Sequence, residues 1–322
     1  MPMVDLPGYR VSYGGMGRWN WIRFIFQLPK ILIQIKRENR WLRRFVRRES
    51  LDGIISDNRY GLHAPGIDSV FITHQLQIRS GLGPLADGIL RKVHYRMIGR
   101  FSRCWVPDFP VQMSLAGALS HPALLPNIPV RYIGPLTRLQ RQEDHLASDQ
   151  YDVLVLLSGP EPQRSGWEKM IVRELHDFRG SALLVRGIPH AGPAPQIGNH
   201  VHTVNHLSGA ALSQAISGSS VVISRSGYST VMDLLLLGKK CILVPTPGQP
   251  EQVYLARYLA SQGWIMTLPQ SKFSIRQSLR LSAQFEYAAF PRIPPAALEA
   301  EVSAWIAQIT PRTEQVDPPL PG

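Results

Sequence analysis

Cysteine and long apolar runs are both scarce in this chain of 322 residues. The two cysteines, Cys104 and Cys241, lie far apart in apolar segments, which predicts buried free thiols rather than a disulfide framework or a zinc site. No apolar run approaches the roughly 18 residues that a membrane-spanning helix needs. The first residues also lack the pattern of a signal peptide. These absences predict a protein of the cytoplasm.

Acidic residues are few as well. The chain has 23 Asp and Glu against 35 Lys and Arg, a net charge of +12. Residues 1–50 hold 11 Lys or Arg and three acids, so they carry +8 and leave +4 for the other 272 residues. A basic N-terminal segment implies an anionic partner, which is a membrane surface, a nucleic acid or a phosphorylated substrate.

Short apolar segments alternate with amphipathic ones along most of the chain. This pattern is typical of parallel sheets covered by helices on both faces, and the chain is too long for one ordinary core. We therefore predict an α/β protein with two Rossmann-like domains, over residues 1–136 and 151–308, joined by a linker at 137–150. The proline-rich residues 309–322 are predicted to be a disordered tail. The expected strands are 52–57, 69–74, 103–108, 130–136, 151–159, 181–187, 201–205, 220–227, 241–245 and 264–269, and the expected helices are 88–100, 164–178, 208–217, 229–238 and 251–263.

Two turns of the second domain, at 226–227 and 247–248, are candidates for a ligand site, because parallel sheets bind ligands at the carboxyl ends of their strands. Both are expected to face the crevice between the two domains. One is "SRSGYSTVMD", where Gly227 allows close approach of backbone and Ser229 or Thr230 is expected to cap the next helix. The free amides of that helix attract phosphate, and Asp233 is placed to accept hydrogen bonds from a ribose. The alternative is that these residues only cap the helix and complement its dipole.

Other turns add polar side chains at the same edge. After "LSG", Arg164 is a possible charged fork for phosphate, or an ordinary residue of the first helical turn. The loop "PTPGQPEQ" ends in Glu251 and Gln252, whose alternatives are sugar recognition and helix capping. His202 and His206 are four positions apart, but on a strand and turn, which disfavours a metal site. In the first domain His74 is a candidate acid–base group or a structural histidine.

Taken together, these motifs resemble glycosyltransferase family 28, which has the GT-B fold of two Rossmann-like domains. The match is strongest over "SRSGYSTVMDLLLLGKKCILVP" and "PGQPEQVYLA", and the resemblance covers roughly residues 5 to 270. The family includes the UDP-N-acetylglucosamine transferase of peptidoglycan lipid II synthesis.

The resemblance implies a role for each matching residue. Asp233 would hold the ribose, although the family more often has Glu there, and Gln252 would contact the sugar. His74 falls near an acceptor-side motif and is the candidate catalytic residue. No metal and no cofactor are implied, since amides and helix dipoles stabilise the leaving diphosphate. The implied donor-binding set is Ser158, Gly159, Arg164, His206, Leu207, Ser226, Gly227, Tyr228, Ser229, Asp233, Gln249, Glu251 and Gln252.

One element of the family pattern is missing. Relatives begin with a strand, a glycine-rich loop and a helix, and "DLPGYRVSY" already stands at residue 5 here. We therefore expect the first domain to be incomplete. The chain is expected to bind UDP through its second domain but to transfer sugar poorly or not at all.

The implied activity is inverting, metal-independent transfer of a sugar from UDP to a lipid-linked or surface-polysaccharide acceptor. A UDP-sugar 2-epimerase and a non-catalytic donor-binding subunit are the alternatives.

A further helix is expected to begin at Pro29, with Ile31, Ile35, Leu42 and Phe45 on one apolar stripe that packs on the first sheet.

The expected surroundings follow from the basic N-terminus. Trp19 and Trp21 stand among arginines, which suits the headgroup layer of an anionic membrane. A peripheral position at the inner face of the cell membrane of a bacterium is therefore expected. No nucleic-acid partner is expected, because no recognised nucleic-acid module accompanies the charge.

Overall fold

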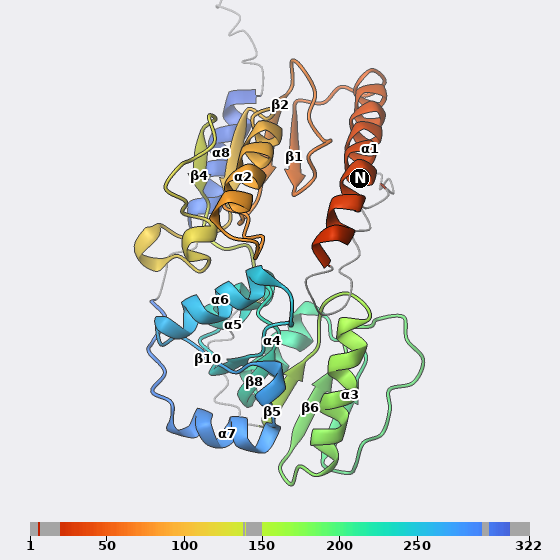
Figure 1. Cartoon of the computed structure of the whole chain (residues 1–322), viewed down its shortest axis with the longest axis vertical. Helices are drawn as coiled ribbons and strands as arrows, with labels where there is room; N and C mark the ends of the chain where they lie inside the picture. Colours follow the sequence, from red (N-terminus) through yellow and green to blue (C-terminus); the bar gives the residue numbers. More distant parts are fainter. Residues whose placement is uncertain (1–5, 7–19, 138, 140–149, 292–295, 310–322) are drawn as a thin grey trace, which may run out of the picture.

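The computed structural model describes residues 6, 20–137, 139, 150–291 and 296–309. Most of the predicted linker and the predicted tail beyond residue 309 lie outside these ranges. The described part forms two parallel sheets, one above the other in Figure 1. The predicted α/β class with two sheets of Rossmann type is thus confirmed.

The first sheet has four parallel strands in the order β1-β2-β3-β4. Alternate residues of β2 point to opposite faces, so Phe71 and Val70 belong to two different cores. The four predicted strands are all present, and three helices accompany them. The strands are β1 (Gly53–Asp57), β2 (Asp68–Ile72), β3 (Arg103–Val106) and β4 (Val130–Tyr132), and the helices are α1 (Asn20–Val46), α2 (Pro84–Ile98) and α8 (Ala296–Ile309).

Helices α1 and α2 cover the same face of this sheet. Ile98 at the end of α2 packs with Phe71, and Leu42 of α1 packs with Ile54 of β1. The register β1–β2 pairs Ser56 with Phe71, so Ile54, two residues earlier, points to the Phe71 side. Figure 1 shows α2 in front of the sheet, α1 beside β1 and α8 behind the sheet.

Two boundaries differ from the sequence prediction. Helix α1 was expected to start at Pro29, but it begins at Asn20 and Pro29 lies inside it. The apolar stripe predicted for α1 does face inward, since Ile35 and Leu42 are buried.

No helix was predicted after residue 263, and residues 296–308 were assigned by chain order to the second domain, yet α8 forms there and packs on the first sheet. Its Trp305 lies edge-on against Trp105 at 5.7 Å between ring centroids and donates a hydrogen bond to Asp68 over 2.8 Å. The chain therefore returns to its first sheet after completing the second.

The second sheet has six parallel strands in the order β10-β9-β8-β5-β6-β7. Helices α4, α5 and α6 pack on one face around Leu154 and Val222, while α3 and α7 pack on the other around Val153 and Trp167. Helix α7 and three short 3₁₀ segments (111–113, 117–119 and 270–272) were not predicted. The elements are β5 (Tyr151–Leu156), α3 (Gln163–His176), β6 (Ala182–Val185), β7 (Val201–Val204), α4 (Gly209–Ser217), β8 (Ser219–Ser224), α5 (Tyr228–Leu236), β9 (Cys241–Leu243), α6 (Pro250–Ser261), β10 (Met266–Thr267) and α7 (Ile275–Gln284).

Both cysteines are buried and free, as predicted. Burial raises the pKa of each thiol to about 12. Neither is therefore a reactive thiolate near neutral pH. Within the described ranges, no helix is long and apolar enough to cross a membrane.

Tyrosines of the second domain attach it to the segment that follows β3. The hydroxyl of Tyr228 donates to the carbonyl of Pro107 at 2.7 Å, and that of Tyr258 donates to Ser114 at 2.9 Å. The amide of Ala118 donates to the Tyr254 hydroxyl at 2.7 Å. Hydrogen bonds from helices α5 and α6 to the segment after β3 therefore join the two domains.

The segment after β3 is itself folded around one carboxylate. Asp108 is fully buried and accepts hydrogen bonds from the amides of Leu115 and Ala116 at 2.7 and 3.1 Å. The hydroxyls of Ser114 and Ser120 donate to it at 2.7 and 2.5 Å. Asp108 thus holds in place the segment that the tyrosines contact.

Candidate functional site

The carboxyl ends of the strands in the two sheets meet at the domain interface. His74 follows β2, and its Nε2 lies 3.0 Å from the Oε1 atom of Glu251 in the first turn of α6. The His74 ring also stacks on the ring of Tyr228 at 4.2 Å between centroids. The sequence prediction that the turns at 226–227 and 247–248 face the first domain agrees with these contacts, which bring together residues 177 positions apart.

The start of α5 is open to a ligand. Gly227 is the N-cap residue, and no side chain caps the helix. The expectation that Ser229 or Thr230 caps it is therefore wrong, because both lie inside the first turn. Uncapped amides at a helix start attract anions, so this turn keeps its capacity for phosphate.

The side chain of Tyr228 is not available to a ligand. It is buried, and its hydroxyl is bound to Pro107. Burial raises the pKa of Tyr228 well above its usual value, so the phenol stays neutral. Only the backbone of Tyr228 is in a position to contact a diphosphate.

The start of α3 differs, because its polar groups are already satisfied. Arg164 is buried between Glu161 and Glu168, with N–O distances of 2.7 and 2.8 Å, and Glu168 also pairs with Arg186. The amide of Ser165 donates to Glu161. The hypothesis that Arg164 binds phosphate is thus at odds with the structure, because its guanidinium forms ion pairs with Glu161 and Glu168.

Two glycines leave space between the helix starts. Gly159 after β5 has a φ of +106°, and a Cβ atom added there would meet nothing within 4 Å. A Cβ atom at Gly227, after the neighbouring strand β8, would likewise meet nothing within 4 Å. Open space beside both glycines at adjacent strand ends is what a bound phosphate chain requires. Ser158, beside Gly159, is half-buried.

Asp233 lies in the second turn of α5, slightly deeper than the sequence indicated. Its Oδ1 accepts a hydrogen bond of 2.5 Å from the hydroxyl of Thr137. Burial raises the pKa of the Asp233 carboxyl, while the Thr137 hydrogen bond opposes that rise. One carboxylate oxygen of Asp233 is therefore held by Thr137.

The loop before α6 is internally bonded. The Gln252 carboxamide accepts from the amide of Thr246 at 2.9 Å and donates to Gln249 at 2.6 Å. The Ser226 hydroxyl donates to the Gln252 carbonyl at 2.8 Å. These bonds tie the turn after β8 to the turn after β9, so Ser226, Gln249 and Gln252 form one rigid unit beside the start of α5.

The remaining predicted residues lie after β7. His206 is exposed, and Leu207 packs partly against the core under α4. The other histidine of the pair, His202, is 3.1 Å from the hydroxyl of Tyr151. Among the residues that the structure describes, no group of three potential metal ligands is found.

Sequence reasoning missed the role of Arg225, which is buried. Its guanidinium lies 4.3 Å from the centre of the Trp167 ring and donates to the carbonyl of Val244 and the side chain of Gln270. Burial lowers the pKa of Arg225 to about 10. Arg225 therefore fixes the end of β8 against β9 and keeps the Gly227 turn in place.

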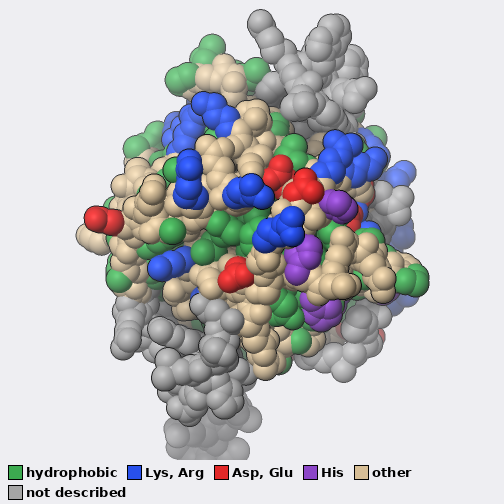
Figure 2. All heavy atoms as spheres, turned by 90° about the horizontal axis from the view of Figure 1, so that it is seen from below, with side chains coloured by type: hydrophobic (Ala, Val, Ile, Leu, Met, Phe, Trp, Pro, Cys, Tyr) green, Lys and Arg blue, Asp and Glu red, His purple; other side chains and the backbone are tan. Residues whose placement is uncertain are grey.

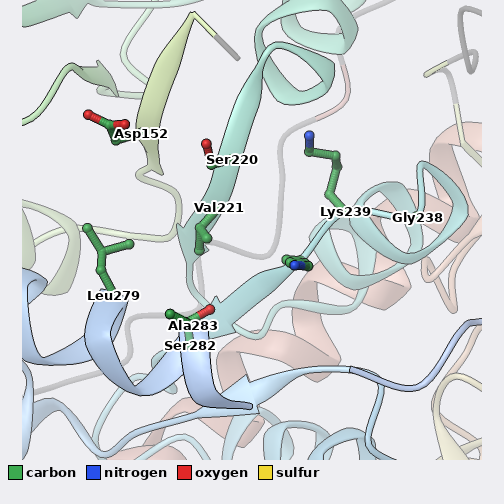
Figure 3. A pocket seen from close by; sticks show the side chains of 9 residues that line it. Asp152, Ser220, Val221, Gly238, Lys239, Leu279, Ser282 and Ala283 are labelled. Atoms are coloured by element: carbon green, nitrogen blue, oxygen red, sulfur yellow. The ribbon is translucent and has the colours of Figure 1, made fainter. Parts of the chain in front are cut away.

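An open cavity of 510 Å³ lies elsewhere, at the amino ends of β5 and β8 beside α7. Figure 3 shows Asp152, Ser220, Lys239 and Leu279 around it. Figure 2 views the molecule from this lower end, where basic, acidic and histidine side chains are interspersed. This cavity is at the opposite edge of the sheet from the predicted residues, so it is not the same site.

Comparison with known proteins supports the family resemblance. Residues 202–295 match the glycosyltransferase family 28 C-terminal domain. A UDP-N-acetylglucosamine–N-acetylmuramyl-(pentapeptide) pyrophosphoryl-undecaprenol N-acetylglucosamine transferase of Bacillus cereus is 29% identical over 156 residues. That match covers 44% of this chain and 43% of the relative, so the chain matches less than half the length of that protein.

Solved structures establish the fold. The glycotransferase of kitacinnamycin superposes with a TM-score of 0.56 at 15% identity, over 88% of this chain and 79% of that one. MurG of Acinetobacter baumannii superposes with a TM-score of 0.51 at 14% identity, over 85% of this chain and 79% of that one. A structure titled as a putative UDP-N-acetylglucosamine 2-epimerase of Listeria monocytogenes superposes with a TM-score of 0.53 at 11% identity, over 86% of this chain and 80% of that one. The chain has the GT-B fold, and that fold is shared by transferases and an epimerase.

Proposed function

We propose that this protein is an inverting glycosyltransferase that moves a sugar, N-acetylglucosamine, from UDP to a lipid-linked or surface-polysaccharide acceptor. The observation that carries the proposal is the uncapped start of α5, with open space at Gly159 and Gly227 and with Asp233 one turn further on. Gly227, the start of α5 and Asp233 lie within residues 202–295, which match family 28, and Gly159 lies outside them. A diphosphate on the α5 amides would direct its ribose toward the Asp233 carboxylate.

The His74–Glu251 pair supplies an acid–base group at the interface. If Nε2–H donates to Glu251, Nδ1 is left to accept a proton from the acceptor hydroxyl. The hydroxyl oxygen then bonds to the anomeric carbon as the bond from that carbon to the UDP oxygen breaks. Helix amides stabilise the negative charge that develops on the leaving diphosphate. His74 is therefore proposed as the general base, and Glu251 as the residue that orients it.

An epimerase is the alternative that the fold favours equally. The two reactions separate when the protein is incubated with UDP-N-acetylglucosamine and no acceptor. An epimerase converts it into a different UDP-sugar, whereas a transferase leaves that sugar unchanged until acceptor is added. A non-catalytic donor-binding subunit would bind UDP and give neither product.

We expect Asp233→Ala to weaken UDP binding by about 1–3 kcal/mol, because the ribose hydroxyls lose a charged acceptor. Calorimetric titration of UDP into wild type and variant measures the difference. Asp177→Ala is the matched control, since Asp177 is an exposed carboxylate at the end of α3. Equal affinities of wild type and Asp233→Ala would contradict the donor-site assignment.

Divalent metal ions are expected to make no difference to UDP binding, because the α5 amides can serve the diphosphate. The same titration is run in EDTA and in millimolar Mg²⁺ or Mn²⁺. The proposal of a site without metal and without cofactor fails if EDTA removes binding and the metal restores it.

We also propose that the protein works as a peripheral protein at the inner face of a bacterial cell membrane, with no nucleic-acid partner. The support is the basic N-terminal segment and the lipid-linked acceptor named for the Bacillus cereus relative. The sequence prediction depended on Trp19 and Trp21. Residue 19 and the side chain of Trp21 lie outside the part of the chain that the structure describes.

A further inference from the structure

The cavity at the amino ends of the second sheet has no part in the proposed reaction. Its volume of 510 Å³ falls within the range of small-molecule sites. Strands β5, β8 and β9 are parallel neighbours, so their amino ends share one edge of the sheet. Gly159 and Gly227 follow the carboxyl ends of β5 and β8, at the opposite edge. A ligand in this cavity would therefore be separate from a donor bound at the start of α5.

Cations line one side of the cavity. Lys239 and Lys240 stand between α5 and β9. The Nζ atom of Lys239 donates at 3.0 Å to the carbonyl of Ser217, the last residue of α4, where the helix dipole favours a positive charge. Lys240 is exposed, and its Nζ atom lies 6.0 Å from the centre of the Tyr287 ring. Two ammonium groups on adjacent residues suit an anionic group such as phosphate.

A carboxylate lies across the cavity from these cations. Figure 3 shows Asp152 and Lys239 on either side of Ser220 and Val221 of β8. The Oδ2 atom of Asp152 accepts hydrogen bonds from the amide and the hydroxyl of Ser181 at 2.7 and 3.2 Å, which hold the carboxylate in place. A carboxylate accepts through both oxygens, so Oδ1 retains the capacity to accept from a ligand hydroxyl. The cavity thus combines a fixed acceptor with two cations.

Aliphatic side chains form much of the remaining lining. Leu279 and Ala283 lie one turn apart on α7, and Val221 of β8 lines the cavity with them. Among the described residues that line the cavity, none is aromatic, so a nucleotide base would have no ring to stack on. The C–H face of a sugar ring can instead pack on aliphatic groups.

We propose that this cavity binds a sugar phosphate, with its phosphate on Lys239 and Lys240 and a ring hydroxyl on Asp152. A sugar phosphate carries together the anion, the hydroxyl donors and the apolar ring face that the three parts of the lining would contact. This inference concerns a second ligand site and does not depend on the proposed transfer reaction.

The strands that begin at the cavity end at the candidate donor site. Strand β8 runs from Ser219 to Ser224, just before the turn at Gly227, and β9 follows directly after Lys240. The length of β8 is roughly 20 Å, which is more than a hexose phosphate spans. One hexose phosphate therefore cannot occupy both sites, and UDP and the sugar phosphate are expected to bind at the same time.

The test is calorimetric titration of the whole chain with glucose 6-phosphate and with glucose 1-phosphate. At least one of them is expected to bind with a Kd below about 1 mM. Glucose lacks the anion and inorganic phosphate lacks the ring, so each should bind at least about tenfold more weakly. Saturating UDP should leave the affinity for the sugar phosphate unchanged.

Two variants locate the ligand in the cavity. Lys240→Gln removes an exposed cation and should weaken sugar-phosphate binding by at least about tenfold, while Ala283→Trp fills the cavity from an exposed position of α7 and should abolish binding. Lys169→Gln on α3 and Ala300→Trp on α8 make the same changes at exposed positions elsewhere, and both should bind as wild type does. Thermal unfolding of every variant reports folding separately from binding.

The proposal is overturned if neither sugar phosphate binds, if UDP competes with it, or if both cavity variants bind it as tightly as their controls. Inorganic phosphate that binds as tightly as the sugar phosphates would also overturn it, because the cavity would then recognise the anion alone.

Discussion

Replacing Gly227 with valine is expected to weaken UDP binding by at least about 100-fold, or close to 3 kcal/mol. The backbone at Gly227 has φ −71° and ψ 141°, a conformation that valine adopts readily. A Cβ atom there meets no other atom within 4 Å, so the fold has room for the new side chain. The valine methyl groups would instead fill the space that the diphosphate needs at the start of α5.

Calorimetry with UDP and thermal unfolding together decide this result. The variant should unfold within a few degrees of wild type and yet fail to bind. Gly88→Val is the control, because Gly88 on α2 also has open space around it and lies in the other domain. Unchanged UDP affinity in Gly227→Val would mean that the diphosphate, if bound, lies elsewhere.

Asp108→Ala is expected to lower the free energy of unfolding by about 3–5 kcal/mol, the largest stability effect we predict. The buried carboxylate accepts hydrogen bonds from two amides and two hydroxyls of residues 114–120, and its removal leaves these donors unpaired. Urea unfolding followed by tryptophan fluorescence measures the change.

Two further variants make this result specific. Asp108→Asn keeps the shape and one acceptor oxygen, so it should fall between wild type and Asp108→Ala. Asp177→Ala should lie within about 0.5 kcal/mol of wild type, because that side chain is exposed. An Asp108→Ala protein as stable as wild type would show that the segment after β3 does not depend on this carboxylate.

The order of strands and helices could be predicted because burial leaves a regular pattern in the sequence. Apolar segments such as "YDVLVLL" are buried on both faces, and the amphipathic segments between them cover the sheet. The packing of α8 could not be predicted in this way, since an apolar stripe does not specify which sheet it covers. The start of α1 was misplaced because Pro29 was taken as a boundary, whereas the helix continues through it.

The parts of the candidate site that are formed by backbone groups could be predicted from the sequence. The contacts of its side chains were harder to predict. Gly227 and the start of α5 follow from local sequence. Arg164 was assigned to a ligand although Glu161 and Glu168 stand three and four positions away, a spacing that indicates ion pairs on a helix. The bond between Thr137 and Asp233 joins residues 96 positions apart, and nothing local in the sequence indicates it.

The return of α8 to the first sheet makes the first domain discontinuous in sequence. A fragment that ended before the second domain would leave Val70, Trp105 and Ile133 without the helix that covers them. An isolated first domain would therefore have to be built as a fusion that joins residues 20–137 directly to 296–309. Conversely, residues 150–291 contain every strand of the second sheet and its packed helices, so they form the natural unit for expressing the second domain alone.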